Sequence, residues 1–383
     1  MLRTIVAELS RLPHRGAATP NEAEAARLLE TYLTEMGADV RIEPFRTPKT
    51  YVSLVYWLLG GIVFGLSFSR PSLWVALFVW IYVVLAWLYF NWRSSPVTTF
   101  PPLSTGHNVI GRWEATADAP APHIVLMAHY DTAPVSLLYG PRQQTSFRAS
   151  LILSLSLMLL AGIAVTVEAI MGAGLPWLPW VRYGLIAYFL GQAILGTAGY
   201  WQHGYTNGAS DNATGVAAAL ATAERLRALS GVTVEVALTS AEEAGMIGAQ
   251  HYVNARKADW PAGQTMAINF DTLGAGKLTV VEQTGTVEVI RYNNEPTRLA
   301  RALVDTAAFK SRAQVGRWHT ADFDSVWFVR ADIPILALCA LDPDGRMPRI
   351  HRPDDRAEAV DLTPVQDAVD LAEAVVWQWL AGR

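Results

Sequence analysis

The chain has 383 residues and a formal net charge of −4, and no basic stripe suits it to a nucleic acid as its main partner. Hydrophobic residues make up 51% and charged residues only 17%, which is too apolar for a wholly water-soluble protein. The single cysteine, Cys339, excludes a disulfide framework and a cysteine zinc site, and its apolar neighbours ILALCA predict a buried strand position.

The N-terminal segment MLRTIVAELSRLPHRG lacks the uninterrupted apolar stretch of a secretory signal, because charged residues break it up. A cleaved export signal is therefore not expected. The first predicted helix begins at Thr19-Pro20, where proline suits the first turn, and ends at Gly37.

Apolar segments without charge then interrupt the chain twice. Each is close to the roughly 20 residues that a helix needs to cross the hydrocarbon layer. They are residues 51–69, 71–92, 149–167 and 183–201. Aromatic rings that favour a membrane interface stand near their ends, at Trp57, Tyr89, Trp92, Trp177, Trp180 and Trp201. We predict two transmembrane hairpins, 51–92 and 149–201, in a multi-pass integral protein of the cell or inner membrane; the alternative is a set of buried core helices.

The basic residues beside these hairpins predict an orientation. One group flanks the segments on the side of the remaining chain: Arg41, Arg46, Lys49, Arg93, Arg142 and Arg148. Only Arg70 and Arg182 are expected on the far turns. By the positive-inside rule this bias places the remaining chain in the cytoplasm.

Residues 1–50, 93–148 and 202–383 are expected to form one catalytic domain. Its predicted strands are 40–45, 108–113, 123–128, 233–239, 266–270 and 335–340, and its further helices are 212–229, 241–255, 296–308 and one from Thr363. Strands that alternate with helices, several apolar on both faces, predict an α/β three-layer sandwich with a mostly parallel sheet.

Histidines and acids follow several of these strands. The fragments are AHYDT with His129 and Asp131, GASDNATG with Asp211, TSAEEAG with Glu242 and Glu243, NFDT with Asp271, and IHRPDD with His351. The carboxyl ends of parallel strands share one edge of a sheet, so we expect the fragments to meet there. Alone, each fragment would be an ordinary loop or helix cap.

Together they predict a site for two zinc ions, or other divalent cations, because zinc takes imidazole nitrogen and carboxylate oxygen. Asp211, Asp271 and Glu243 would offset three of the four positive charges, and a bridging hydroxide would offset the fourth. Glu242 would be the general base. Asp131 would fix the tautomer of His129, and Asp354 or Asp355 that of His351.

This pattern resembles the co-catalytic dinuclear zinc aminopeptidases, the family of bacterial leucyl aminopeptidase and aminopeptidase Y, with glutamate carboxypeptidase II and glutaminyl cyclase as distant relatives. The resemblance covers residues 20–45, 105–135 and 203–380. It implies one zinc on His129 and Asp271, another on Glu243 and His351, Asp211 between them, and a cis peptide bond from Asp211 to Asn212.

Two departures from the family stand out. Ser325 follows Asp324 where the family often has histidine, and 82 positions separate His129 from Asp211. Residues 136–205, which contain the second hairpin, account for that spacing. We expect this insertion to lie above the metal pair, with the mouth of the site near the membrane surface.

The sequence thus predicts a membrane-anchored aminopeptidase that acts on peptides with a free N-terminus through a hydroxide between two zinc ions. Three alternatives stay open: a glutaminyl cyclase-like acyltransferase with one zinc, a non-catalytic receptor or scaffold, and a carboxypeptidase. His319 is a candidate substrate contact. For Trp318, Trp327 and Phe328, core packing is favoured over a pocket wall.

Overall fold

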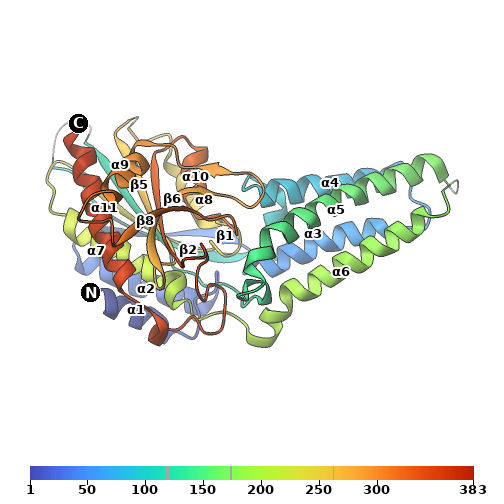
Figure 1. Ribbon diagram of the computed structural model, residues 1–383, viewed down its shortest axis with the longest axis horizontal. Helices are drawn as coiled ribbons and strands as arrows, with labels where there is room; N and C mark the ends of the chain where they lie inside the picture. Colours follow the sequence, from blue (N-terminus) through green and yellow to red (C-terminus); the bar gives the residue numbers. More distant parts are fainter. Residues whose placement is uncertain (117–120, 173–174, 262) are drawn as a thin grey trace.

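The computed structural model describes residues 1–116, 121–172, 175–261 and 263–383. The chain forms an α/β body from which a bundle of four long helices projects to one side (Figure 1). Both chain ends lie on the body. The two hairpins predicted from the sequence are the two pairs of helices in this bundle.

The body is built on one nine-stranded sheet. Its strands are β1 (Asp39–Thr47), β2 (Ser104–Trp113), β3 (His123–His129), β4 (Thr233–Thr239), β5 (Thr265–Phe270), β6 (Lys277–Thr284), β7 (Ile290–Arg291), β8 (Ala313–Arg317) and β9 (Ile335–Leu341). The strand order is β1-β2-β4-β3-β5-β9-β6-β7, and β8 also pairs with β6.

Strand directions are mixed. The four central strands β4, β3, β5 and β9 run parallel, whereas β1, β2 and β6 join the sheet by antiparallel pairing. The expectation of a mostly parallel sheet therefore holds for the centre only. It missed β6, β7 and β8. The two-residue β7 and the five-residue β8, which contains Gly316, carry little periodic signal, and the buried positions of β6 do not alternate.

Helices cover both faces of this sheet. Their bounds are α1 (Leu2–Arg11), α2 (Pro20–Glu35), α7 (Thr214–Leu226), α8 (Ile247–Arg256), α9 (Glu295–Val304), α10 (Val326–Arg330) and α11 (Thr363–Ala381). One core lies between the sheet and α1, α2, α7, α9 and α11, and a second lies between its other face and α8 and α10. The sheet is thus the middle layer of three.

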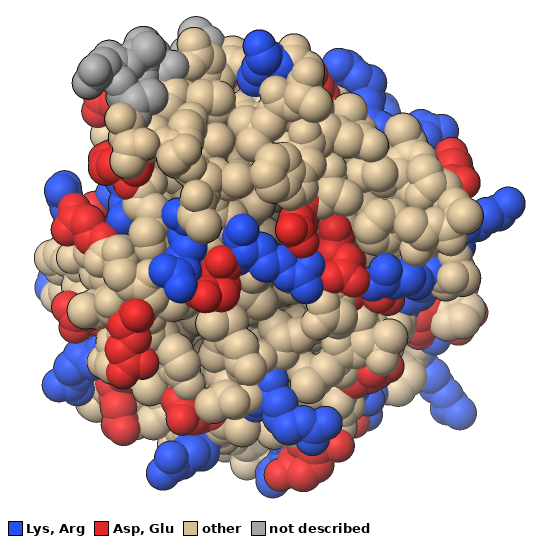
Figure 2. Space-filling view, turned by 90° about the vertical axis from the view of Figure 1, so that its left-hand side faces the viewer, with Lys and Arg blue, Asp and Glu red and all other residues tan. Residues whose placement is uncertain are grey.

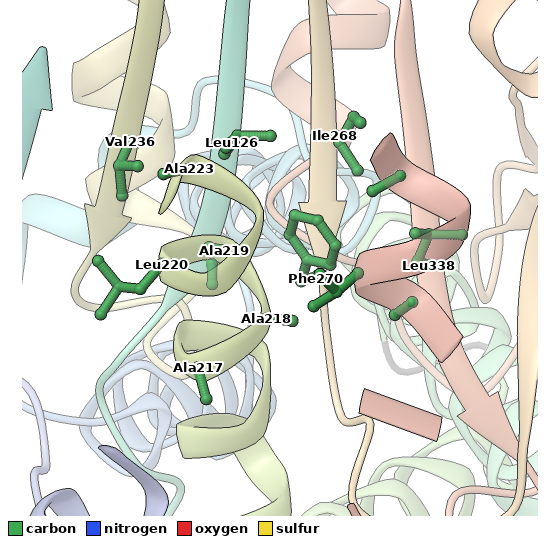
Figure 3. Packing of buried hydrophobic residues seen from close by; sticks show 14 of the residues in the cluster. Leu126, Ala217, Ala218, Ala219, Leu220, Ala223, Val236, Ile268, Phe270 and Leu338 are labelled. Carbon is green, nitrogen blue, oxygen red and sulfur yellow. The ribbon is translucent and has the colours of Figure 1, made fainter. Parts of the chain in front are cut away.

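Helix α7 is rich in alanine and is buried nearly all round, between the sheet and the helices α1 and α11. Ala217, Ala218 and Ala219 are fully buried, and Figure 3 shows them opposite the β-branched and aromatic side chains of the central strands. Small side chains let the helix axis approach the sheet. This close contact fixes the start of α7, which adjoins the site described below.

The bundle consists of α3 (Tyr51–Leu66), α4 (Leu73–Phe90), α5 (Gln144–Met171) and α6 (Leu178–His203). The second pair is longer than the predicted 149–167 and 183–201, because both helices continue through polar residues at their ends. Helices α4 and α5 are long and apolar enough to cross a membrane, and α3 is a shorter apolar helix.

The outer surface of the bundle is apolar. Trp74 is 80% exposed, Trp180 is 74% exposed and Ile170 is 68% exposed. Its interior is also apolar, with Leu54, Ile62 and other side chains packed between the helices. The four helices therefore project from the body with large apolar side chains on their exposed surface.

Arg182 corrects one prediction. It does not lie on a far turn but inside α6, where it is 2% exposed and pairs with Glu168 of α5 at 2.7 Å. Its Nη1 also donates to the carbonyl oxygens of Leu66 and Phe68 at the end of α3. A cation at a helix C-terminus satisfies free carbonyl groups, so Arg182 ties three helices together at the far end of the bundle.

Candidate metal centre

The sheet brings the histidines and acids singled out in the sequence to one edge. His129 ends β3, Glu242 and Glu243 follow β4, and Asp271 follows β5. Asp211 lies in a π-helical turn, Ala209–Ala213, just before α7. His351 comes from the loop after β9. The side chains of His129, Asp211, Glu243 and Asp271 are buried. Those of Glu242 and His351 are partly buried.

Two groups of side chains share Asp211. Its Oδ1 lies 3.3 Å from Nε2 of His129, and that nitrogen is 3.7 Å from Oδ2 of Asp271. Its Oδ2 lies 3.3 Å from Nε2 of His351, and that nitrogen is 3.0 Å from Oε2 of Glu243. Each group presents ligand atoms within 4.8 Å of one another, as a metal ion requires.

Glu242 stands beside the first group. Its carboxylate forms a third cluster with the carboxylate of Glu243 and the ring of His129, and the ligand atoms of this cluster also lie within 4.8 Å of one another. Burial raises the pKa of Glu242 well above its usual value, and the neighbouring acids add to the shift although His129 opposes it. A carboxylate that lies beside a site without being paired to Asp211 can act there as a general acid or base.

Asp131 and Asp355 hold the backbone of the site. Asp131 accepts hydrogen bonds from the amides of Glu242 (3.1 Å) and Glu243 (3.3 Å), and it lies 3.5 Å from Nδ1 of His129. Asp355 accepts from the amides of Ser210 (2.7 Å) and Asp211 (3.1 Å).

The prediction that Asp354 or Asp355 would orient His351 is therefore wrong. Asp354 pairs with Arg352 at the surface, and Asp355 turns to the loop of Asp211 instead. The ring of His351 packs on Tyr139, with centroids 4.2 Å apart, and its Nδ1 makes no hydrogen bond. The peptide bond from Asp211 to Asn212 is cis, as predicted.

The charges at the site fit divalent cations. Burial and neighbouring acids raise the pKa of Glu243 and of Asp271 to about 7, although histidines oppose the shift. Oδ2 of Asp211 and Oε1 of Glu243 are buried without a hydrogen-bond partner. Buried charges need a partner, and this set of imidazole nitrogens and carboxylate oxygens is one that zinc accepts.

A cavity of about 310 Å³ opens onto these side chains. Its walls include Glu242, Asp322 and the two groups around Asp211, as well as residues of all four bundle helices. Among the described residues that line it there is no lysine and no arginine. The site therefore carries negative charge at one end and apolar walls at the other.

The inserted helices contact the site directly. The hydroxyl of Tyr89, in α4, donates to the carbonyl of Ala244 at 3.2 Å, in the loop that carries Glu242. Ser136, just before α5, donates its amide to the carbonyl of His351 at 3.0 Å. The second insertion thus adjoins the site, as expected from its place between His129 and Asp211.

Residues that the sequence did not single out also support the site. Arg15 is fully buried and donates to the carbonyl oxygens of Tyr130, Asn207 and Gly208, which joins the segments of His129 and Asp211. Thr272 donates to both Asp211 and Asp271. Arg15 lies four residues beyond the end of α1, and nothing in the sequence pattern marks it as a contact of these segments.

Residues 318–328 contain the remaining positions singled out from the sequence, and only some of them line the cavity. Asp324 is buried and accepts from Thr239 at the end of β4, and Ser325 bonds to Tyr292. Trp318 lines the cavity as well as packing in the core, whereas Phe328 lies in the core. His319 bonds to the carbonyl of Gly285 and is not among the described residues that line the cavity. Cys339 is buried in β9, as predicted.

Comparisons with known proteins agree with this architecture. A model of the family described as Peptidase family M28 matches residues 191–376. No curated protein matches the chain. The solved structures that share the fold include a glutaminyl cyclase from Bacteroides thetaiotaomicron, with 14% identity, coverage of 98% of this chain and 96% of that chain, and a TM-score of 0.58.

A zinc aminopeptidase from Bacillus subtilis is similar at 15% identity, with coverage of 98% and 93% and a TM-score of 0.57. The LapA aminopeptidase of Legionella pneumophila is similar at 14% identity, with coverage of 100% and 71% and a TM-score of 0.54. At these identities the likeness concerns the fold.

Proposed function

We propose that this chain, of which residues 191–376 match a model of peptidase family M28, is a metallo-exopeptidase, namely a membrane-anchored aminopeptidase with two metal ions. One observation carries this proposal: the two oxygens of Asp211 face two separate groups, each with one histidine and one acid. A carboxylate in this position can bridge two cations about 3.5–4 Å apart.

In this proposal His129 and Asp271 hold one ion, Glu243 and His351 hold the other, and Asp211 binds both. Asp131 keeps the amides of Glu242 and Glu243 in place and neighbours the ring of His129. Two zinc ions there would polarise the scissile carbonyl and lower the pKa of the attacking water.

Glu242 is the proposed general base. Its carboxylate takes one proton from the attacking water and passes it to the leaving amine nitrogen as the C–N bond breaks. The products are a free carboxylate on the released residue and a new amino end on the peptide. The raised pKa of Glu242 supports this role, because the group can hold the proton between the two events.

The charge of the cavity supports the choice of substrate end. Besides the residues proposed to hold the ions, its described lining contains the carboxyl groups of Glu242 and Asp322 and no lysine or arginine, so a substrate ammonium group is favoured over a C-terminal carboxylate. This argues against the carboxypeptidase alternative, which needs a basic group at the same place.

The surface of the bundle supports membrane anchoring. Large apolar side chains such as Trp74, Trp180 and Ile170 face outward, and α4 and α5 have the length and composition of spanning helices. Exposed apolar surface of this extent marks a membrane or protein interface. The basic residues near the body favour a cytoplasmic catalytic domain, as the positive-inside rule predicts.

The test is a joint measurement of metal content and activity on the purified full chain in detergent. We expect two zinc equivalents, release of amino acid from aminoacyl anilides, and no release when the amino group is acetylated. One zinc equivalent with cyclisation of glutaminyl peptides would establish the cyclase alternative. A pure, folded protein without either activity would support the receptor alternative.

A further inference from the structure

The cavity at the metal centre continues into the helical bundle. Its walls include Val55, Leu58 and Leu59 of α3, Tyr89 and Phe90 of α4, Leu151, Leu155 and Met158 of α5, and Gln192 and Gly196 of α6. The same cavity is lined by His129, Glu242 and His351. The side chains proposed to carry out hydrolysis thus share one space with the interior of the bundle.

This space is deep. The lining residues of α5 run from Ser146 to Met158, just over three turns or about 18 Å of helix axis. Those of α3 run from Tyr51 to Leu59, about 12 Å. Both helices begin at the body and lead away from it, so the far end of the cavity lies well inside the bundle (Figure 1).

The polar groups in this part of the wall are already bonded to one another. Ser154 donates to the carbonyl of Ser150 and shares a hydrogen bond with the hydroxyl of Tyr188 at 2.8 Å. Gln192 donates to the same hydroxyl at 3.2 Å. With these bonds satisfied, the bundle part of the cavity presents mainly hydrocarbon to a ligand.

The ligand must therefore match two ends of different character. At the body, Glu242 and Asp322 line the cavity and no lysine or arginine is among its described lining residues, which suits an amino group and disfavours an anionic lipid headgroup. In the bundle, apolar walls suit a long alkyl or aromatic chain. A short hydrophilic peptide would leave the deep part unfilled.

We propose that the substrates are amphiphilic peptides with a free amino end and a long apolar chain on one of the two residues that flank the scissile bond, and that this chain lies between α3 and α5. This inference rests on the proposed aminopeptidase function. The reaction is unchanged: water adds to the carbonyl carbon, the C–N bond breaks, and the amine leaves with one added proton.

Two series of dipeptides test it with the full chain in detergent. In one series the first residue is a straight-chain 2-aminoalkanoic acid of increasing length and the second is alanine; in the other the order is reversed. Released amino acids are measured by mass spectrometry. In one series kcat/KM should rise by roughly fourfold for each added methylene until the cavity is filled.

Met158→Trp should shorten the longest chain that still raises kcat/KM, because it fills the deep end of the cavity. Leu159→Trp is the matched control, since Leu159 is the next residue and is 46% exposed on the outside of the bundle. Substrate partitions into micelles to the same extent for both variants. The ratio of their kcat/KM values therefore reports the effect of the cavity alone. Leu155→Trp, nearer the site, should shorten the optimum further.

Thermal unfolding curves and zinc contents that match those of Leu159→Trp show that Met158→Trp is folded. If wild type cleaves short and long dipeptides equally in both series, or if Met158→Trp and Leu159→Trp keep the same chain-length profile, the inference is overturned while the proposed function stands. If wild type cleaves no dipeptide, the proposed function itself fails.

Discussion

The α/β body and the helical bundle both have apolar interiors but differ in the side chains that they expose. The face of the body opposite the bundle carries Lys, Arg, Asp and Glu intermixed over its surface (Figure 2), and its cores are apolar. The bundle has tryptophans outside and the Arg182–Glu168 pair inside. One chain is thus fitted to two surroundings, water around the body and, as we propose, hydrocarbon around the bundle.

The two regions also divide the work at the site. Every histidine and acid of the proposed metal centre comes from the body, whereas the bundle contributes cavity wall and second contacts such as that of Tyr89. Substitutions in the body should therefore remove the chemistry for all substrates. Substitutions in the bundle should change its stability, the position of the loop that carries Glu242, or the length of substrate chain that the cavity accepts.

Glu242→Gln is expected to have the largest effect. Loss of a general base lowers kcat by about 10²–10⁴-fold, and the amide should leave zinc content nearly unchanged because Glu242 is not a proposed ligand. Steady-state kinetics and elemental analysis on the same sample measure both. Glu24→Gln, at an exposed position of α2, is the control. Loss of zinc in Glu242→Gln would refute the assigned role.

Arg182→Leu should affect the bundle and spare the chemistry. Removing one partner of a buried pair costs about 3–5 kcal/mol, because Glu168 is left buried without a counter-charge. Thermal unfolding in detergent, followed by tryptophan fluorescence, should shift strongly, while hydrolysis of alanyl-alanine at low temperature persists. Arg70→Leu, on the exposed turn, should change the unfolding temperature little. Equal shifts of the unfolding temperature for both variants would contradict the role of Arg182 in joining the three helices.

Adding Glu168→Leu to Arg182→Leu sharpens this test. Replacing both partners of a buried pair by apolar residues is often neutral or stabilising. The double variant should therefore recover part of the lost stability. The carbonyls of Leu66 and Phe68 lose their donor in both variants, so recovery should be incomplete.

The central part of the fold was predictable because its signal is periodic and local. Strands β3, β4, β5 and β9 are apolar on both faces, and α2 begins at the Thr19-Pro20 signal, where Thr19 accepts from the amide of Glu22. Helix α8 was predicted from 241 but begins at Ile247, because Ala241 and Met246 have positive φ in the loop that presents the acids. Propensity alone does not reveal such a loop.

The proposed site illustrates the same limit. The histidines and acids stand at strand ends, a position that the sequence reveals, and the structure brings them together as ligand atoms within 4.8 Å. Arg15 and Asp355 were not assigned their bonding partners, because each acts on the backbone of a segment distant in sequence. Long-range contacts between a side chain and a loop carbonyl leave no periodic trace.

Tyr89→Phe should have a smaller effect, at the junction of the two regions. It removes the bond to the carbonyl of Ala244, and an unsatisfied buried carbonyl costs about 1–3 kcal/mol. The loop of Glu242 should shift, so kcat should fall by roughly tenfold with little change in KM. Tyr82→Phe, on the same helix, is the control. Equal kinetics for the two variants would show that the bundle does not position this loop.

The smallest effect is expected at the surface of the body. Arg225 pairs with Asp370 at 3.0 Å and with Glu373 at 2.6 Å, between α7 and α11. Partial burial raises the pKa of Asp370, but hydrogen bonds from Arg312, Gln366 and Arg225 outweigh it and hold the pKa below its usual 3.8. The stability from this shift is complete above pH 3.8 and is lost as the pH falls through the lower folded value.

Arg225→Gln should accordingly cost only about 0.2–1 kcal/mol near neutral pH, as exposed ion pairs do. The difference from wild type should shrink in acid, where Asp370 becomes protonated, and in high salt, which screens the pair. Chemical denaturation at several pH values measures it, with exposed Arg298→Gln as the control. A loss as large as that of Arg182→Leu would mean that the body, like the bundle, depends on its ion pairs, and the contrast between the two regions would fail.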